Sequence, residues 1–216
     1  SAASDVYKRQ SFQLMVETGS LEVLNILANA SATIAEGEVL QLTVSRDIST
    51  DEEIYLKVIR GKTAALFSAA TQVGAVISRS EETIINALYE YGDALGVAFQ
   101  IVDDLLDVAG DSKIIGKNNG DDFRERKLTL PFIKAISSCN QNEKDFWKRT
   151  IEKGDQTSED FNTALELMQK YEAIERTRLD ALKWAKTAKN SLDAVPDNDI
   201  KIILTALAEY VVDRVK

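Results

Sequence analysis

The feature that most constrains this chain is an apolar stretch with three aspartates inside it, residues 99–107. Val97, Ile101 and Leu105 recur at four-residue spacing, which is typical of one face of an α-helix. The stretch therefore predicts a helix that lies deep in a helical core. Only two prolines and ten glycines occur in 216 residues, which favours long helices over a many-turned β protein. We predict an all-α fold, with one sizeable core or at most two small ones.

The three aspartates predict a metal site. At about 100° per residue, Asp103 and Asp107 share a helix face one turn apart, and Asp104 lies on its shoulder. Like charges at this spacing repel, and burying an unpaired carboxylate costs several kcal/mol. A divalent cation would offset that cost, and three oxygen donors from two adjoining turns suit Mg²⁺. The alternative is a solvated acidic face, but the apolar residues around the aspartates favour the metal.

The composition excludes several other kinds of site. Histidine is absent, which excludes Ser-His-Asp and Cys-His catalysis and His-ligated zinc. The single cysteine, Cys139, cannot form an internal disulfide and fits a reducing compartment. The net charge of -9 disfavours a general nucleic-acid binder. No apolar run approaches the roughly 20 residues that span a bilayer, so we predict a cytoplasmic protein.

Upstream of the aspartates, the sequence predicts a second long helix. Residues 49–53, Ser-Thr-Asp-Glu-Glu, are a strong helix start, in which either hydroxyl residue can form a capping box with the glutamate three positions later. Lys62 and Thr63 follow between small residues, which leave space for a ligand above the ammonium group. Taken alone, a surface lysine is the more common outcome. Gly92 and Gly96, one turn apart, predict a close approach of two helices.

A long polar loop, residues 111–127, follows directly after the aspartate helix. Long loops on a helical scaffold are usually functional or disordered. Gly116 and Gly120 bracket Lys117, so the loop could fold a cation over bound phosphate. It is not a P-loop, because the Gly-Lys-Ser/Thr ending and the preceding strand are missing.

Taken in order, these motifs resemble those of the trans-isoprenyl diphosphate synthases, the polyprenyl synthetase family. Residues 99–107 resemble the second aspartate-rich motif of that family, and Lys62-Thr63 falls where the family has its Lys-Thr pair. The match continues through residues 116–122 and 127–131. Two further segments look most like the long-chain, octaprenyl-type members: 11–15 and 34–42.

The resemblance implies a bundle of long helices around a central apolar cavity, and head-to-tail prenyl transfer. An allylic diphosphate held by Mg²⁺ would ionise, isopentenyl diphosphate would attack the cation, and a proton would then leave. The implied metal ligands are Asp103, Asp104 and Asp107. The implied catalytic and substrate-binding residues are Lys62, Lys117 and Lys127 on the diphosphate, with Thr63 and Gln100 to orient it and Phe99 beside them.

One departure from the family is large, because its first aspartate-rich motif and the arginine pair after it are not found before Phe12. We therefore expect the C-terminal two-thirds of such an enzyme, inactive by itself, with residues 1–10 as a foreign or disordered leader and 11–216 as the helical domain. The family also implies a homodimer. The alternatives are a non-catalytic subunit that regulates a partner chain, and a terpene cyclase, which the 116–122 motif disfavours.

Overall fold

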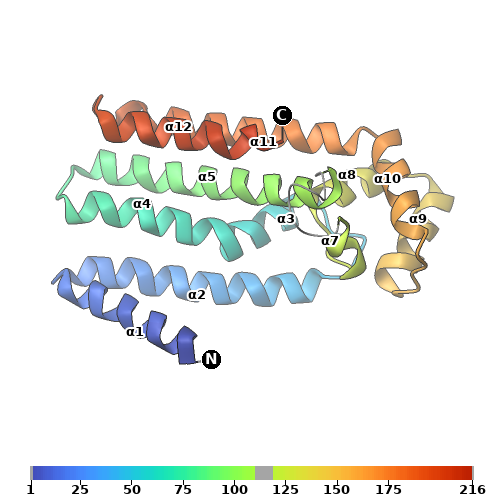
Figure 1. Ribbon diagram of the computed structural model, residues 1–216, viewed down its shortest axis with the longest axis horizontal. Coiled ribbons are helices and arrows are strands. Elements are labelled where there is room, and N and C mark those ends of the chain that lie inside the picture. The colour runs from blue at the N-terminus through green and yellow to red at the C-terminus, as the bar shows by residue number, and fades with distance from the viewer. Residues whose placement is uncertain (1, 110–118, 216) are drawn as a thin grey trace.

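The computed structural model describes residues 2–109 and 119–215, with side chains from Arg9 onward. Within these ranges every regular element is helical, so the predicted all-α class is confirmed. The long helices α2, α4, α5, α11 and α12 lie side by side, and the short helices α7 to α10 gather at one end of them (Figure 1). The elements are α1 Ala2–Glu17, α2 Leu21–Val44, α3 Glu52–Ile59, η1 Arg60–Ala64, α4 Ala65–Ile77, α5 Glu82–Ala109, α7 Asp121–Arg124, α8 Leu130–Ser138, α9 Gln141–Trp147, η2 Lys148–Glu152, α10 Asp160–Lys170, α11 Ala173–Ser191, η3 Leu192–Ala194 and α12 Asp199–Asp213.

Helix α5 is the centre of the bundle, packed between α4 and α11. Its apolar side chains, including Val97, Ile101 and Leu105, are almost completely buried, as the spacing predicts. A Cβ added at Gly92 would lie 2.6 Å from the Phe67 carbonyl oxygen. A Cβ atom essentially never comes so close to a neighbouring heavy atom. Gly92 therefore allows α4 and α5 to approach closely, as predicted.

The start of α3 differs from the predicted capping box. Asp51 is the N-cap, and its carboxylate accepts from the backbone N–H of Ile54 at 2.9 Å. Both hydroxyl residues have other partners, because Ser49 donates to Asp47 and Thr50 donates to the Val44 carbonyl. The charged cap is also favourable at the positive end of the helix dipole.

Two irregular turns of π-helix interrupt the regular helices. The first, η1, joins α3 to α4 and carries Lys62 and Thr63. The second, η2, follows α9 and packs into a separate aromatic core around Trp147. Such turns are rare and occur often at functional sites, so η1 indicates a candidate functional site in its surroundings.

Two remaining sequence predictions concern the chain as a whole. Helix α1 runs without a break from residue 2 to residue 17, so the division into a leader and a domain at residue 10 stays a prediction. Across residues 2–109 and 119–215, no helix combines the length and apolar character needed to cross a bilayer.

Candidate active site

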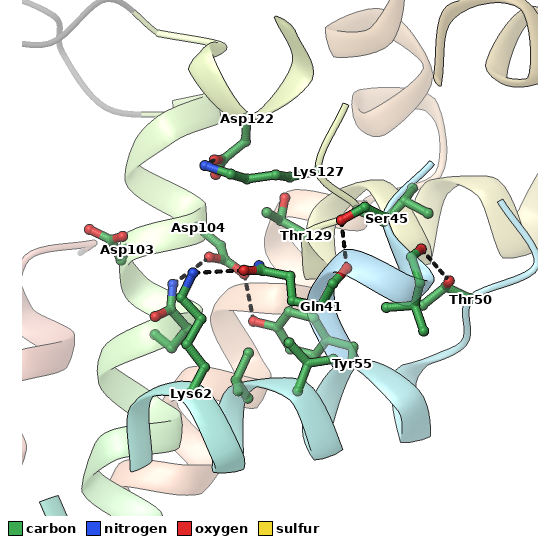
Figure 2. A pocket seen from close by; sticks show the side chains of 15 residues that line it. Gln41, Ser45, Thr50, Tyr55, Lys62, Asp103, Asp104, Asp122, Lys127 and Thr129 are labelled. Atoms are coloured by element: carbon green, nitrogen blue, oxygen red, sulfur yellow. Dashed lines mark hydrogen bonds and ion pairs between the residues drawn. The ribbon is translucent and has the colours of Figure 1, made fainter. Parts of the chain in front are cut away.

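A pocket of about 190 Å³ lies where α2, α3, η1, α5 and the α7–α8 connection meet (Figure 2). Five of the predicted site residues line it: Lys62, Gln100, Asp103, Asp104 and Lys127. A larger groove, of about 910 Å³, runs between α2 and α4, but no predicted site residue lines it. The smaller pocket is therefore the candidate site, and it brings together residues from positions 41 to 129.

Lys62 reaches the pocket from η1 and is held by α2. Its ammonium group donates to Gln41 Oε1 at 2.7 Å and lies 3.5 Å from Glu38 Oε1. Its side chain is about one-third exposed, so it is neither fully solvated nor sealed in the core. The structure thus places Lys62 on a pocket wall, with its charge fixed by partners on the neighbouring helix.

Asp104 is buried, and both of its carboxylate oxygens accept hydrogen bonds. Tyr55 donates to Oδ2 at 2.6 Å, and Gln100 Nε2 donates to Oδ1 at 2.9 Å. Removal from water raises the pKa of Asp104 to about 7, against the lowering effect of those two donors. Asp103, the preceding residue, is exposed and lies on the pocket wall.

Asp107 faces α7 and does not line the pocket. Its two oxygens accept from the backbone N–H groups of Asp121 and Asp122, at 3.1 and 3.2 Å, so it fixes the start of α7. Burial raises the pKa of Asp107, and the neighbouring charge of Asp122 raises it further. The sequence placed Asp103 and Asp107 on one helix face, but Asp103 lines the pocket whereas Asp107 holds α7, which the helical period does not indicate.

Asp122 and Lys127 form the wall opposite η1. Lys127 Nζ lies 3.4 Å from Asp122 Oδ1, and it also pairs with Glu125 at 2.5 Å. Burial raises the pKa of Asp122, although the ammonium group of Lys127 opposes that shift. The position of α7, tied to Asp107, therefore brings one carboxylate and one cation into the pocket.

The other predicted site residues lie elsewhere. The hydroxyl of Thr63 donates to Gln100 Oε1 at 2.9 Å, so Thr63 touches the site through Gln100. Phe99 packs against Phe67, with ring centroids 5.4 Å apart, on the α4 side of α5. Lys117 lies outside the described residues.

The donor set at this pocket suits a divalent cation held jointly with a ligand. Asp103 and Asp122 supply hard oxygen donors, and the charge of Asp103 adds to the rise in the pKa of Asp122. A cation would relieve that repulsion. No three acidic side chains in the described residues come together closely enough to hold an ion. Magnesium commonly takes one or two carboxylates and completes its octahedron with water and phosphate oxygens, so the residues fit it.

Six further polar residues line the pocket that the sequence did not single out as site residues: Gln41, Ser45, Thr50, Tyr55, Asp122 and Thr129. Asp122 and Thr129 fall within motifs that carry the family resemblance, and that resemblance could have identified them as site residues. The Thr129 hydroxyl is buried and has no hydrogen-bond partner among the described residues. Gln41 lies within residues 34–42, which also carry that resemblance. Tyr55 had no signal, because its contact is with a residue 49 positions away.

Comparison with known proteins defines the class of this fold and site. Residues 2–168 match the family model described as polyprenyl synthetase. The chain is 37% identical over 209 residues to octaprenyl diphosphate synthase of Haemophilus influenzae, covering 97% of this chain and 63% of that protein. The chain therefore belongs to the polyprenyl synthetase family. It spans less than two-thirds of the length of this relative.

Solved structures agree with the family assignment. A decaprenyl diphosphate synthase from Rhodobacter capsulatus superposes with a TM-score of 0.91 at 58% identity, covering 96% of this chain and 64% of that one. A polyprenyl synthase from Caulobacter crescentus, described as complexed with calcium and isoprenyl diphosphate, gives a TM-score of 0.89 at 45% identity, covering 94% and 62%. The helical arrangement of Figure 1 is thus that of polyprenyl synthases.

Proposed function

We propose that this chain is part of an octaprenyl-type polyprenyl diphosphate synthase, which condenses isopentenyl diphosphate head-to-tail onto an allylic diphosphate with Mg²⁺. The observation that carries the proposal is the pocket itself, where carboxylates of Asp103 and Asp122 lie with the ammonium groups of Lys62 and Lys127. A diphosphate needs both kinds of group, cations for its oxygens and carboxylates for the metal it carries. The names of the relatives support the choice of substrate class.

Each residue has a definite task in this reaction. Mg²⁺, when bound, neutralises the negative charge that grows on the departing diphosphate. Asp103 would hold it directly, and Asp104 and Asp107 could do so only through lone pairs that their hydrogen bonds leave free. Lys62 and Lys127 would bind diphosphate oxygens, and their prior placement stabilises the leaving group without reorganisation. No histidine base is required, because the released diphosphate can accept the proton.

We further propose that the 216-residue chain does not catalyse elongation alone. The family reaction, as the resemblance implies it, uses two aspartate-rich motifs, and Asp-Asp-x-x-Asp occurs once in this sequence. Incubation with farnesyl diphosphate, labelled isopentenyl diphosphate and Mg²⁺, followed by product chromatography, should show no elongated product. Detectable elongation would contradict this part of the proposal.

Calorimetry tests the ligand class. The purified chain is titrated with inorganic pyrophosphate in the presence of Mg²⁺, and again in the presence of EDTA. We expect saturable binding only with Mg²⁺. A non-catalytic subunit that had lost the site would bind in neither condition, so that result would reject the proposed function and favour the alternative.

We also propose that two copies pair through α1 and α2. Phe12, Val39 and Leu42 are apolar and between 63% and 77% exposed, which is unfavourable for a surface left in water. Leu42→Asp should shift the chain towards monomer in size-exclusion chromatography with light scattering. Leu207→Asp, at an exposed leucine of α12, is the matched control and should not. A monomeric parent chain would contradict the pairing.

A further inference from the structure

Tyr55 is the residue of the pocket whose arrangement is least explained by packing alone. Its ring is 4% exposed on α3, and its hydroxyl donates to a carboxylate 49 positions later in the sequence. Figure 2 shows the hydroxyl directed at Asp104, underneath the cations of the pocket. A phenylalanine would fill the same volume without a polar atom, so the hydroxyl is the part to explain.

Three hydrogen bonds connect Tyr55 to the Lys-Thr turn. Tyr55 donates to Asp104, Gln100 donates to the other oxygen of Asp104, and Thr63 donates to the amide oxygen of Gln100. We name Tyr55, Asp104, Gln100 and Thr63 the relay. Tyr55 and Thr63 lie eight positions apart on the continuous run of α3 and η1, while Gln100 and Asp104 lie one turn apart on α5. The relay therefore fastens the irregular turn to α5 at two points.

The relay also fixes the direction of every donor in it. When Asp104 is ionised its carboxylate only accepts, so Gln100 turns its NH₂ group towards Asp104 and its oxygen towards Thr63, as the two hydrogen bonds show. The Thr63 hydroxyl then gives its single hydrogen to Gln100. The second N–H of Gln100, on the pocket wall, is the donor that remains for a ligand. Without the Tyr55 hydroxyl, Asp104 would be free to rotate and this orientation would no longer be imposed.

We propose that Tyr55 is a positioning residue for the diphosphate pocket, acting through Asp104 to orient Gln100 and to hold the turn that carries Lys62. This inference rests on the proposed function. It also gives Asp104 a different task from the one the resemblance implies. Its two oxygens serve the relay, and the pocket-facing carboxylates Asp103 and Asp122 are left for the cation.

Tyr91 provides a matched control for the loss of a buried hydroxyl. It is completely buried on α5, and its hydroxyl donates to the Leu204 carbonyl at 2.7 Å; neither residue lines the pocket. Tyr55→Phe and Tyr91→Phe each remove one hydroxyl and the hydrogen bond that it donates. Both should lower the melting temperature, since unpaired buried groups are costly.

The experiment compares these variants by calorimetry with Mg²⁺ and inorganic pyrophosphate, at a temperature where all of them are folded. Tyr55→Phe should weaken binding about tenfold, as expected for the loss of one well-placed donor. Tyr91→Phe should bind as the parent chain does. Equal affinities for the parent, Tyr55→Phe and Tyr91→Phe would overturn the inference and leave the proposed function intact. Failure of the parent chain to bind would overturn both.

A double variant tests whether the effect passes along the relay. Thr63→Val alone should also weaken binding, and Tyr55→Phe with Thr63→Val should be little worse than either single variant, because both break one connected unit. If the affinity losses of the two single variants multiply in the double variant, Tyr55 and Thr63 contribute independently, and this result would overturn the inference. Should Tyr55→Phe fail to fold, Tyr55→Phe with Asp104→Leu removes both partners and restores an apolar contact. Thr63→Val should then add no further loss in that background, and an added loss would overturn the inference.

Discussion

The two halves of α5 differ in function: the first packs closely against neighbouring helices, and the second carries the carboxylates of the candidate site. In the first half, Gly92 lets α4 approach to backbone distance, and Tyr91 ties the helix to α12. In the second half, Asp104 and Asp107 are buried or half-buried carboxylates with raised pKa values. The first half also has a half-buried carboxylate with a raised pKa, Asp93, but it pairs with Arg60 at 3.1 Å. In the second half, Asp104 and Asp107 accept from neutral donors among the described residues.

This difference separates stability from binding along a single helix. Substitutions at the close-packed and buried positions of the first half should destabilise the protein without a specific effect on ligand affinity. Substitutions of the carboxylates of the second half should reduce ligand binding and cost little stability, or even increase it, because functional sites commonly hold groups that are unfavourable for the fold.

Gly92→Val should produce the largest loss of stability. Its Cβ would lie 2.6 Å from the Phe67 carbonyl oxygen, so α4 and α5 would have to separate. We expect the free energy of unfolding, measured by urea titration, to fall by about 3 kcal/mol or more. Gly74→Ala is the control, because nothing lies within 4 Å of its added Cβ. That variant should gain up to about 1 kcal/mol, and similar losses for both glycines would contradict the account.

Asp103→Asn should have the largest effect on binding. Removing the pocket-facing charge should weaken Mg²⁺-dependent pyrophosphate binding about a hundredfold, or roughly 2.7 kcal/mol, and leave the melting temperature nearly unchanged. Glu90→Gln removes a charge from an exposed position of the first half of α5 and should leave affinity unchanged. Equal losses in the two variants would mean that only the net charge of the chain matters.

The pH dependence of the free energy of unfolding should reflect the titration of the Asp104 carboxyl. Its pKa is raised to about 7, so between about pH 4 and pH 7 the folded chain holds a proton that the unfolded chain has lost. The stabilisation from this proton is fully present below the pKa of Asp104 in the unfolded chain, and it is lost as the pH rises through the pKa in the folded chain. The free energy of unfolding falls by up to about 1.4 kcal/mol per pH unit over this range. Asp104→Asn should flatten urea-derived stability over this range. An unchanged slope would contradict the burial of that carboxyl.

The smallest effect is expected at a surface ion pair outside both halves. Lys189 on α11 pairs with Glu209 on α12, and both side chains are partly exposed. Lys189→Ala should change the free energy of unfolding by less than about 1 kcal/mol and leave pyrophosphate affinity unchanged. A larger loss would show that the α11–α12 contact supports the site, which the contrast within α5 does not predict.

The sequence predicted the parts of this molecule that local patterns determine. The apolar period around Ile101 identified α5 and its burial, and the glycine pair identified the close approach of α4. The period also placed Asp103 and Asp107 on one helix face with Asp104 on its shoulder, but it did not indicate what each carboxylate contacts. The partner of Asp104 is Tyr55, which precedes it by 49 positions, and no local pattern reports such a contact.

Two other features could not be predicted for related reasons. A π-turn such as η1 adds a residue to the helical period, so a regular period cannot place Lys62 or Thr63 accurately. The cap of α3 is Asp51 because distant and neighbouring groups occupy Ser49 and Thr50. Lys117 lies outside the described residues, and its contact with phosphate stays a prediction.

The central claim is that Asp103, Lys62 and Lys127 bind a magnesium diphosphate together, and a crystal structure with Mg²⁺ and pyrophosphate tests it most directly. We predict an ion at about 2.0–2.1 Å from the Asp103 carboxylate and from a phosphate oxygen, with both lysine ammonium groups bound to the same diphosphate. A diphosphate bound elsewhere, with Asp103 in solvent and no ion beside it, would contradict the account.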